Sequence, residues 1–402
     1  MHRARGSRLW PIDNLCLAVI GIAAGCELHL VELRRKEFRA TVLSLTAAVT
    51  ATTWAFVFPA VLLLGPHIGF LRGATRGRLL SVASLAATLG VARSPASMIA
   101  VLREMDARGP FCSLVMSVTV VKDVLVLLLF SVNVELVYAV EAAAAEGKLG
   151  LPALLTRCLA TPALKLAVSA VLGAVGGVLL GALLVQPRVG DRGALPAAVL
   201  LLAAIMFLGA RALPAEPLLV CVSAGALAAN RREERGERQR EELHSLVGQL
   251  MPWVNLTFFT LAGAALAVDA LAATAPVAAV IHAVRLLSLV AATAADAFGL
   301  PRELRRVTWM AMVTQAGVAL GLARTVLARF PAWGGDFYAL MVATIVLNQA
   351  VGPPLFRAAI VAVGEHHKQR SAAQSPGGSL PSSPAVSLAM PPNLASSDGH
   401  DG

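Results

Sequence analysis

Long uninterrupted apolar segments recur along this sequence, and they constrain its fold more than any other feature. Many reach about eighteen residues, the length at which a helix can cross the hydrocarbon core of a bilayer. Because that core holds no water to satisfy the backbone, only helices or a closed barrel can span it. The segments are too long and too continuous for barrel strands, which alternate and cover about ten residues. The sequence therefore predicts an all-α, polytopic transmembrane helical bundle.

The apolar segments indicate about eleven spans. With 57% of the 402 residues hydrophobic and 14% charged, the chain has more such segments than a soluble domain needs. Around them we expect a polar lead over 1–13, a transmembrane domain over 14–363 with a cytoplasmic linker helix over 229–246 inside it, and a disordered Ser/Pro-rich tail over 364–402. The approximate limits of the spans are 14–33, 41–64, 79–102, 112–140, 162–186, 194–211, 213–229, 246–269, 275–297, 304–328 and 336–363.

The formal net charge of +10 lies mostly in short loops between spans, which argues against a nucleic-acid partner. Alternate loops differ in arginine and lysine content, and the richer set is expected to face the cytoplasm. This orientation places the C-terminus inside and the first residue outside. The richer set contains Arg34, Arg35, Lys36, Arg39, Arg103, Arg108, Arg188, Arg192, Arg231, Arg232, Arg235, Arg238, Arg240, Arg302, Arg305 and Arg306.

Several kinds of chemistry leave no signal in the sequence. No phosphate-binding glycine loop followed by Lys-Ser/Thr is present, so a built-in ATPase is not expected. The five cysteines are scattered without a CxxC pair, which argues against a disulfide framework or a metal centre. No nucleophile elbow or acid–His–nucleophile grouping occurs. We therefore expect neither an enzyme nor a bound cofactor.

Two of the spans contain helix-breaking polar segments. The third places Arg93, Ser94 and Pro95 at its middle, and Pro95 removes a backbone hydrogen bond and disfavours helical geometry at Ser94. The tenth places Gln315 and Gly317 at its middle. The two spans are an odd number of crossings apart, so they enter the membrane in opposite orientations. Opposed broken helices indicate an inverted repeat with a transporter site near the midplane.

Charged residues inside the spans cost about 2.5–3.5 kcal/mol each at the helix centre. Glu135 and Asp296 are near enough to span ends to reach the interface, whereas Lys122, Asp123 and Arg285 are too deep. The charged residues in spans are Glu27, Arg93, Lys122, Asp123, Glu135, Arg285 and Asp296.

Lys122 and Asp123 are adjacent, and adjacent helical residues do not face one another. Each therefore needs another partner or water, although pure structural pairing remains an alternative. The functional interpretation makes Asp123 a carboxylate in a hydrated cavity that binds a proton or a cation in turn. Desolvation favours its neutral form and neighbouring cations favour its charged form, and a carboxylate between these influences can titrate.

Three further groups are candidates for roles beside this pair. Arg285 is expected to hold a partner carboxylate between transport steps. His282, three residues earlier, either shares that face or is a packed core histidine. Glu27 and His29 lie near the end of the first span and are expected to anchor it at the interface.

Six segments in this order carry a family resemblance: "AAGCELHLVELRR", "ARSPASMIAVLREMDARGPF", "VTVVKDVLVLLLF", "VNLTFFTLAGAAL", "TQAGVALGLA" and "VLNQAVGPPLF". Over roughly 15–363 the chain resembles the monovalent cation:proton antiporter superfamily, in its sodium/hydrogen-exchanger and potassium-efflux branch. The resemblance implies a core in which two unwound helices cross. It also implies a dimerisation domain, and hence a homodimer, against which the core makes an elevator-like movement.

The resemblance also implies roles for individual residues. Arg93, Ser94 and Pro95 match the crossover motif, and Gln315 and Gly317 match the second unwound segment. Lys122 and Asp123 match an acidic pair, and Arg285 matches a later basic residue. The ion- and proton-binding residues expected are Asp123, Lys122, Ser94 and Thr119.

The chain departs from the family pattern in three respects. Lys122 stands where the pair has an acid or asparagine, so the usual salt bridge to the later basic residue cannot form. Arg285 must then find another carboxylate, with Asp123 the candidate, and we expect electroneutral exchange of one cation for one proton. Arg93, where an acid is common, adds positive potential that weakens cation binding. Eleven spans instead of twelve or thirteen imply that two N-terminal helices are absent.

The sequence thus predicts a secondary active transporter that exchanges Na⁺ or K⁺ for H⁺. One alternative is an anion or organic-acid carrier of the same architecture, because Arg93, Lys122 and Arg285 outnumber the single deep acid Asp123. The other alternative is a non-transporting, degenerate paralogue, which the altered pair and the missing helices favour.

Overall fold

The computed structural model describes residues 3–27, 36–146, 160–185, 194–230, 236–264, 268–294 and 300–366. Within these ranges the secondary structure is helical and no strand occurs. The elements are α1 (Arg3–Cys26), α2 (Lys36–Leu64), η2 (Gly65–His67), η3 (Gly69–Leu71), α3 (Arg76–Val91), α4 (Pro95–Glu104), α5 (Pro110–Glu146), α7 (Thr161–Val185), α8 (Ala194–Ala212), α9 (Pro217–Ala229), α10 (Gly236–Ala264), α11 (Val268–Ala294), α12 (Arg302–Ala311), α13 (Gly317–Arg329) and α14 (Gly334–Val363).

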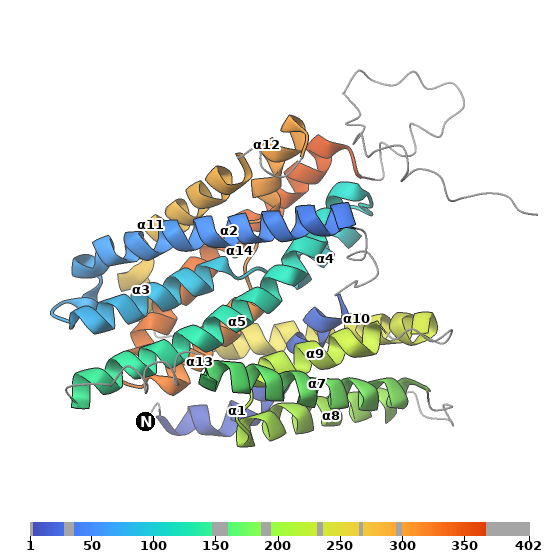
Figure 1. The fold of residues 1–402 in the computed structure, drawn as a ribbon, viewed down its shortest axis with the longest axis horizontal. Coiled ribbons are helices and arrows are strands. Elements are labelled where there is room, and N and C mark those ends of the chain that lie inside the picture. Colours follow the sequence, from blue (N-terminus) through green and yellow to red (C-terminus); the bar gives the residue numbers. More distant parts are fainter. Residues whose placement is uncertain are drawn as a thin grey trace, which may run out of the picture.

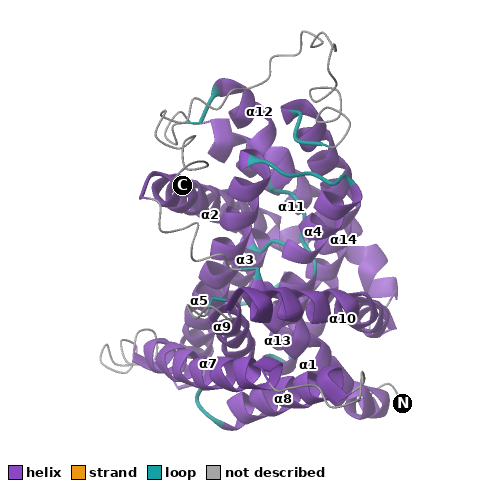
Figure 2. Ribbon diagram, turned by 90° about the vertical axis from the view of Figure 1, so that its right-hand side faces the viewer, coloured by secondary structure: helices purple, strands orange, loops and turns teal. Residues whose placement is uncertain are grey.

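The helices form two layers. In the scaffold layer, α1 and α7–α10 pack together, and in the core layer α2–α5 and α11–α14 pack together (Figures 1 and 2). Small residues bring α1 and α9 into backbone contact, because a Cβ added at Gly25 would lie 2.1 Å from the Val222 carbonyl oxygen. A Cβ added at Gly225 would lie 2.2 Å from the Ile22 carbonyl oxygen. This close approach is typical of helices packed in a membrane.

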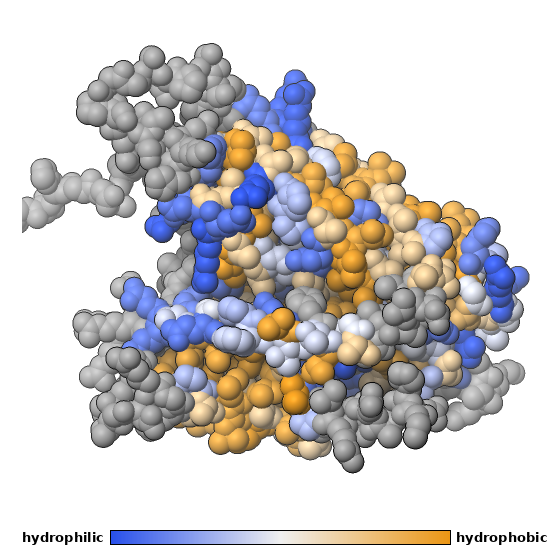
Figure 3. Space-filling model, turned by 180° about the vertical axis from the view of Figure 1, so that it is seen from behind, coloured by the Kyte–Doolittle hydropathy of each residue, from blue (hydrophilic) through white to orange (hydrophobic). Residues whose placement is uncertain are grey.

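The surface is that of an integral, multi-pass membrane protein. Seven helices, or helix pairs, among the described residues are long and apolar enough to cross a bilayer, and α1 and α9 contain shorter apolar helices. Figure 3 shows broad hydrophobic areas on one flank, with hydrophilic residues toward its two ends. Each of the expected spans corresponds to one helix or to one interrupted pair. The membrane setting predicted from the sequence is therefore confirmed.

The connection between the two halves differs from the separate linker helix expected over 229–246. Its described part, from Gly236, is continuous with the following span, so that α10 runs unbroken to Ala264. Its Arg/Glu-rich first turns contain no proline, and they extend the span instead of ending it. Of the expected tail, only 364–366 lies within the described residues.

The core layer contains two similar three-part units, α2–α3/α4–α5 and α11–α12/α13–α14. In each unit the middle helix is interrupted. The backbone is non-helical over 92–94, where Ser94 caps α4 by accepting a hydrogen bond from the Ser97 amide at 3.3 Å. It is interrupted again over 312–316, before Gly317 starts α13. The two broken spans predicted from Pro95 and Gly317 are thus confirmed.

Candidate functional site

The two helix breaks lie against each other in the core layer. The Gln315 side chain donates a hydrogen bond to the Leu89 carbonyl at the end of α3. Arg93, from the first break, donates to the Ala311 carbonyl at the end of α12. The last carbonyls of a helix lack partners within it, so each break supplies donors to the end of the opposite helix. The predicted crossing of the two broken helices is therefore present.

Arg285 on α11 joins the same two helix ends. Its Nε donates to the Gly90 carbonyl at 2.7 Å and its Nη1 to the Val313 carbonyl at 2.9 Å. The side chain is 0% exposed, and none of its hydrogen-bond partners among the described residues is a carboxylate. The carboxylate that Arg285 is expected to hold between transport steps is thus not bound to it in this conformation. The C-terminal ends of α3 and α12 carry partial negative charge and provide the acceptors instead.

Asn348 on α14 completes this arrangement and was not among the residues predicted. Its Oδ1 accepts from Arg285 Nη1 at 2.9 Å, and its Nδ2 donates to Gln315 Oε1 at 2.9 Å. Its Oδ1 also lies 2.9 Å from His282 Nδ1, so His282 is a hydrogen-bonded neighbour of the site. A signal was present in the sequence. Asn348 and Gln349 are polar residues within the apolar sequence of α14, much as Lys122 and Asp123 are within that of α5.

Lys122 and Asp123 lie beside the crossing, at the middle of α5. Lys122 is 0% exposed and Asp123 2% exposed. Neither Lys122 Nζ nor either oxygen of Asp123 has a hydrogen-bond partner of normal geometry among the described residues. The pair is therefore not a locked salt bridge. Asp123 lies close enough to Arg93 for the amide and guanidinium of that residue to act on its carboxyl group.

Arg93 and Thr119 form the polar wall next to Asp123. Arg93 Nη1 donates to Thr119 Oγ1 and lies 3.1 Å from the Met312 sulfur. Arg93 Nη2 lies 3.0 Å from the Met98 sulfur. Thr119 lies one turn before Asp123 and bonds to the Val115 carbonyl at 2.7 Å. The structure thus brings Arg93, Thr119 and Asp123 together beside the crossing.

A cavity of about 340 Å³ between the two layers reaches this crossing. Its inner end is formed by Ser94, Pro95, Ala316 and Gly317, and the Ser97–Gln349 hydrogen bond of 2.9 Å lies on its wall. The residues that line it do not include Lys122 or Asp123. The hydrated cavity expected at Asp123 therefore ends at Ser94 in this conformation, and the carboxyl group lies behind the crossing.

The outer end of this cavity is lined by Glu27, Arg103 and His244, at the arginine-rich end of the molecule. Glu27 was expected to be an interfacial anchor, and its Oε1 lies 3.6 Å from His244 Nδ1. His29 and Asp296 lie outside the described residues. The cavity thus opens between the core and scaffold layers on the side predicted to be cytoplasmic.

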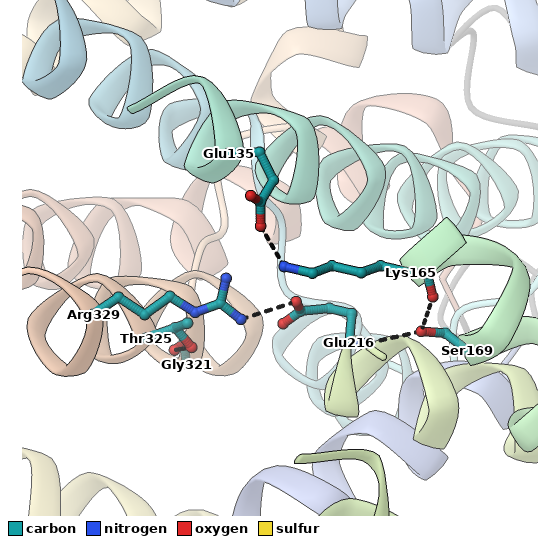
Figure 4. A network of polar contacts seen from close by, with 7 residues as sticks. All are labelled: Glu135, Lys165, Ser169, Glu216, Gly321, Thr325 and Arg329. Atoms are coloured by element: carbon teal, nitrogen blue, oxygen red, sulfur yellow. Dashed lines mark hydrogen bonds and ion pairs between the residues drawn. The ribbon is translucent and has the colours of Figure 1, made fainter. Parts of the chain in front are cut away.

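Three ion pairs connect the layers at the opposite end, and we call them the interlayer ion pairs. Figure 4 shows two of them. Glu135, expected to reach the interface alone, instead pairs with Lys165 on α7. The Glu216 amide before α9 donates to Ser169 Oγ at 2.7 Å, which fixes this carboxylate in place. The three pairs are Glu135–Lys165, Glu216–Arg329 at 3.2 Å, and Asp13–Arg324.

Two broken helices that cross beside a buried acid, next to a second helical layer, define a membrane protein of the antiporter fold. The transmembrane model of the sodium/hydrogen exchanger family matches residues 14–372, so the chain belongs to that family. The family is one of transporters, and the resemblance expected from the motifs is confirmed.

A solved structure supports the fold independently. The chain is similar to the solved structure of the sodium proton antiporter MjNhaP1 from Methanocaldococcus jannaschii, which was determined at pH 8. The TM-score is 0.64 and the sequence identity is 14%. The match covers 90% of this chain and 87% of that chain. A comparison with curated proteins found no match.

Proposed function

We propose that this protein exchanges a monovalent cation, Na⁺ or K⁺, for H⁺, with Asp123 binding the two ions alternately. The observation that carries the proposal is a carboxyl group that is 2% exposed beside two crossing helix breaks and that forms no ion pair with the described residues. A charged carboxylate buried without a partner is costly, so it favours taking up either a proton or a cation. Oxygen ligands suit such a hard cation, and we propose that the hydroxyls of Thr119, one turn before Asp123, and of Ser94, in the first helix break, join the carboxylate in binding it.

Alternating access in this proposal comes from movement of the core layer against the scaffold layer, in a homodimer built on the scaffold. The structure is open at the arginine-rich end, where the cavity reaches Ser94. The interlayer ion pairs hold the layers together at the opposite end. Opening the site toward that end requires these pairs to break.

The experiment that tests the function is transport by the purified full chain in proteoliposomes with an internal pH dye. Na⁺, K⁺ and Li⁺ are added in turn against an imposed proton gradient. Cation-dependent pH change in protein-containing vesicles is expected, and its absence for all three ions would favour the non-transporting alternative.

A second candidate function is anion transport, favoured by one observation. Arg93, Lys122 and Arg285 are each 0% exposed, and Arg93 and Lys122 lie close enough to Asp123 to act on its carboxyl group. Arg285 and Arg93 are, however, already bonded to helix-end carbonyls, which leaves Lys122 as the cation available to an anion. Uptake that depends on the anion supplied and survives Asp123→Asn would establish this second function.

Lys122 is expected to set the stoichiometry. In Lys122→Asp a second carboxylate stands beside Asp123, so the site can release two protons for one cation and exchange becomes electrogenic. Transport is measured at several potassium-clamped membrane potentials. Lys122→Asn is the matched control and should stay insensitive to voltage, as the unaltered protein does. Voltage-insensitive exchange by Lys122→Asp would contradict this account of stoichiometry.

The interlayer ion pairs are expected to control how often the opposite end opens. In Glu216→Gln the pair with Arg329 is lost, which shifts the population toward the opened state by about five-fold, equivalent to ~1 kcal/mol. The measurement is the rate at which a thiol reagent added from that end labels a cysteine placed at Thr325. Glu104→Gln is the control, because its partner Arg357 lies in the same layer. Equal labelling rates in the two variants would argue against a gating role.

A further inference from the structure

A second cavity lies away from the helix crossing, between α11 and α12 at the arginine-rich end. Its volume is about 320 Å³. Val290 and Thr293 of α11 form one wall. The other wall, from α12, consists of Arg302, Arg305, Arg306 and Trp309. Three guanidinium groups and one indole around a single hollow give it a strongly cationic character.

Among the residues that the structure describes, the charge of this cavity is not balanced by acidic lining residues. No described acidic side chain contributes to its wall, and Glu303 of the same helix is exposed and outside it. Among the described residues, Arg302 and Arg306 take part in no ion pair. The two arginines are one helical turn apart on α12, so their guanidinium groups can converge on one anion. A phosphate group fits such a site, because guanidinium groups bind its oxygens with paired hydrogen bonds.

The cavity also continues into an apolar surface. Val280, Leu287 and Val290 on α11 are 45%, 59% and 38% exposed, and their spacing places them on one side of that helix. Trp309 is at the rim, and tryptophan is enriched where membrane proteins meet the headgroup layer. A soluble phosphate would use only the arginines, whereas a lipid would use the arginines and the exposed face of α11.

We propose that this cavity binds the headgroup of a phosphate-bearing anionic lipid, whose acyl chains lie along the exposed face of α11. Basic pockets between membrane helices suit such headgroups. The site is separate from Asp123 and does not depend on which ion is transported.

The test uses the purified full chain in detergent with three probes. These are phosphatidic acid, phosphatidylcholine with the same acyl chains, and inorganic phosphate. Lipid retention is measured by native mass spectrometry, and the midpoint of thermal unfolding is measured with and without each probe. Phosphatidic acid is expected to be retained and to raise the midpoint, with phosphatidylcholine and inorganic phosphate having little effect.

Variants locate the effect. Arg302→Gln and Arg306→Gln should each weaken phosphatidic acid binding by about five-fold. Arg39→Gln is the matched control, because Arg39 is an exposed arginine of α2 that does not line the cavity. Arg302 and Arg306 are both exposed, so neither substitution should change the midpoint of thermal unfolding without lipid.

Three outcomes would overturn the proposal. Equal binding of phosphatidylcholine would show that charge is not recognised, and equal stabilisation by inorganic phosphate would show that no lipid is needed. Unchanged binding of phosphatidic acid by both cavity variants would place the lipid elsewhere.

Discussion

Asp123→Asn is expected to reduce cation-dependent proton flux in proteoliposomes to the level of protein-free vesicles. Asparagine keeps the size of the side chain but can neither release a proton nor neutralise a cation. Asp123 is 2% exposed and makes no hydrogen bond of normal geometry with the described residues. Removing its charge breaks no ion pair among the described residues, and the asparagine carbonyl can still accept from the nearby Arg93 amide, so the protein should still fold.

The matched control for this variant is Asp106→Asn. Asp106 is an exposed loop residue with a φ of 44°, a conformation that asparagine adopts as readily as aspartate. Asp106→Asn should transport at the unaltered rate. Flux retained by Asp123→Asn at more than a tenth of the control rate would remove Asp123 from the exchange mechanism.

Arg285→Met is expected to be the most destabilising single substitution at the crossing, by about 3–5 kcal/mol, because hydrogen bonds to a charged group contribute about 1.5–3 kcal/mol each and several are lost. Methionine fills much of the same volume but donates no hydrogen bond. The carbonyls of Gly90 and Val313, together with Asn348 Oδ1, would lose their shared donor inside a buried site. A buried acceptor without a donor costs its full desolvation energy.

The stability of this variant is measured by thermal unfolding of detergent-purified protein. Arg285→Lys should restore part of the loss, because lysine keeps the charge but cannot bridge several carbonyls with one planar group. Arg324→Met is a useful comparison, since that arginine is only partly buried. If Arg285→Met unfolds at the same temperature as the unaltered protein, Arg285 does not hold the two helix ends together.

The sequence predicts well those structural features that depend on a few neighbouring residues, such as helix breaks and span limits. Pro95 and Gly317 mark the breaks in two apolar spans, and both breaks occur at those positions. Span length follows from the thickness of the bilayer, so the limits of most spans could be predicted from apolar segments alone. The crossing itself was expected only because the motifs resemble a known family.

The features that sequence reasoning missed depend on partners far apart in the chain. Charge counting paired Arg285 with a carboxylate, but backbone carbonyls at helix ends do not appear in any count of charged side chains. Glu135 was treated as an isolated charge because Lys165 reaches it only after the chain has turned back in α7. Asn348 is neutral, so the pattern of buried charges in the sequence does not indicate it.

The most direct test of the central claim is the pH dependence of the apparent KM for the transported cation. If one carboxyl group binds either the proton or the cation, the two ions compete. In the acidic range, where the site is mostly protonated, KM should then rise about tenfold for each unit decrease in pH, with the maximal rate unchanged when the cation is saturating. A KM that stays constant over that range would contradict competition at Asp123.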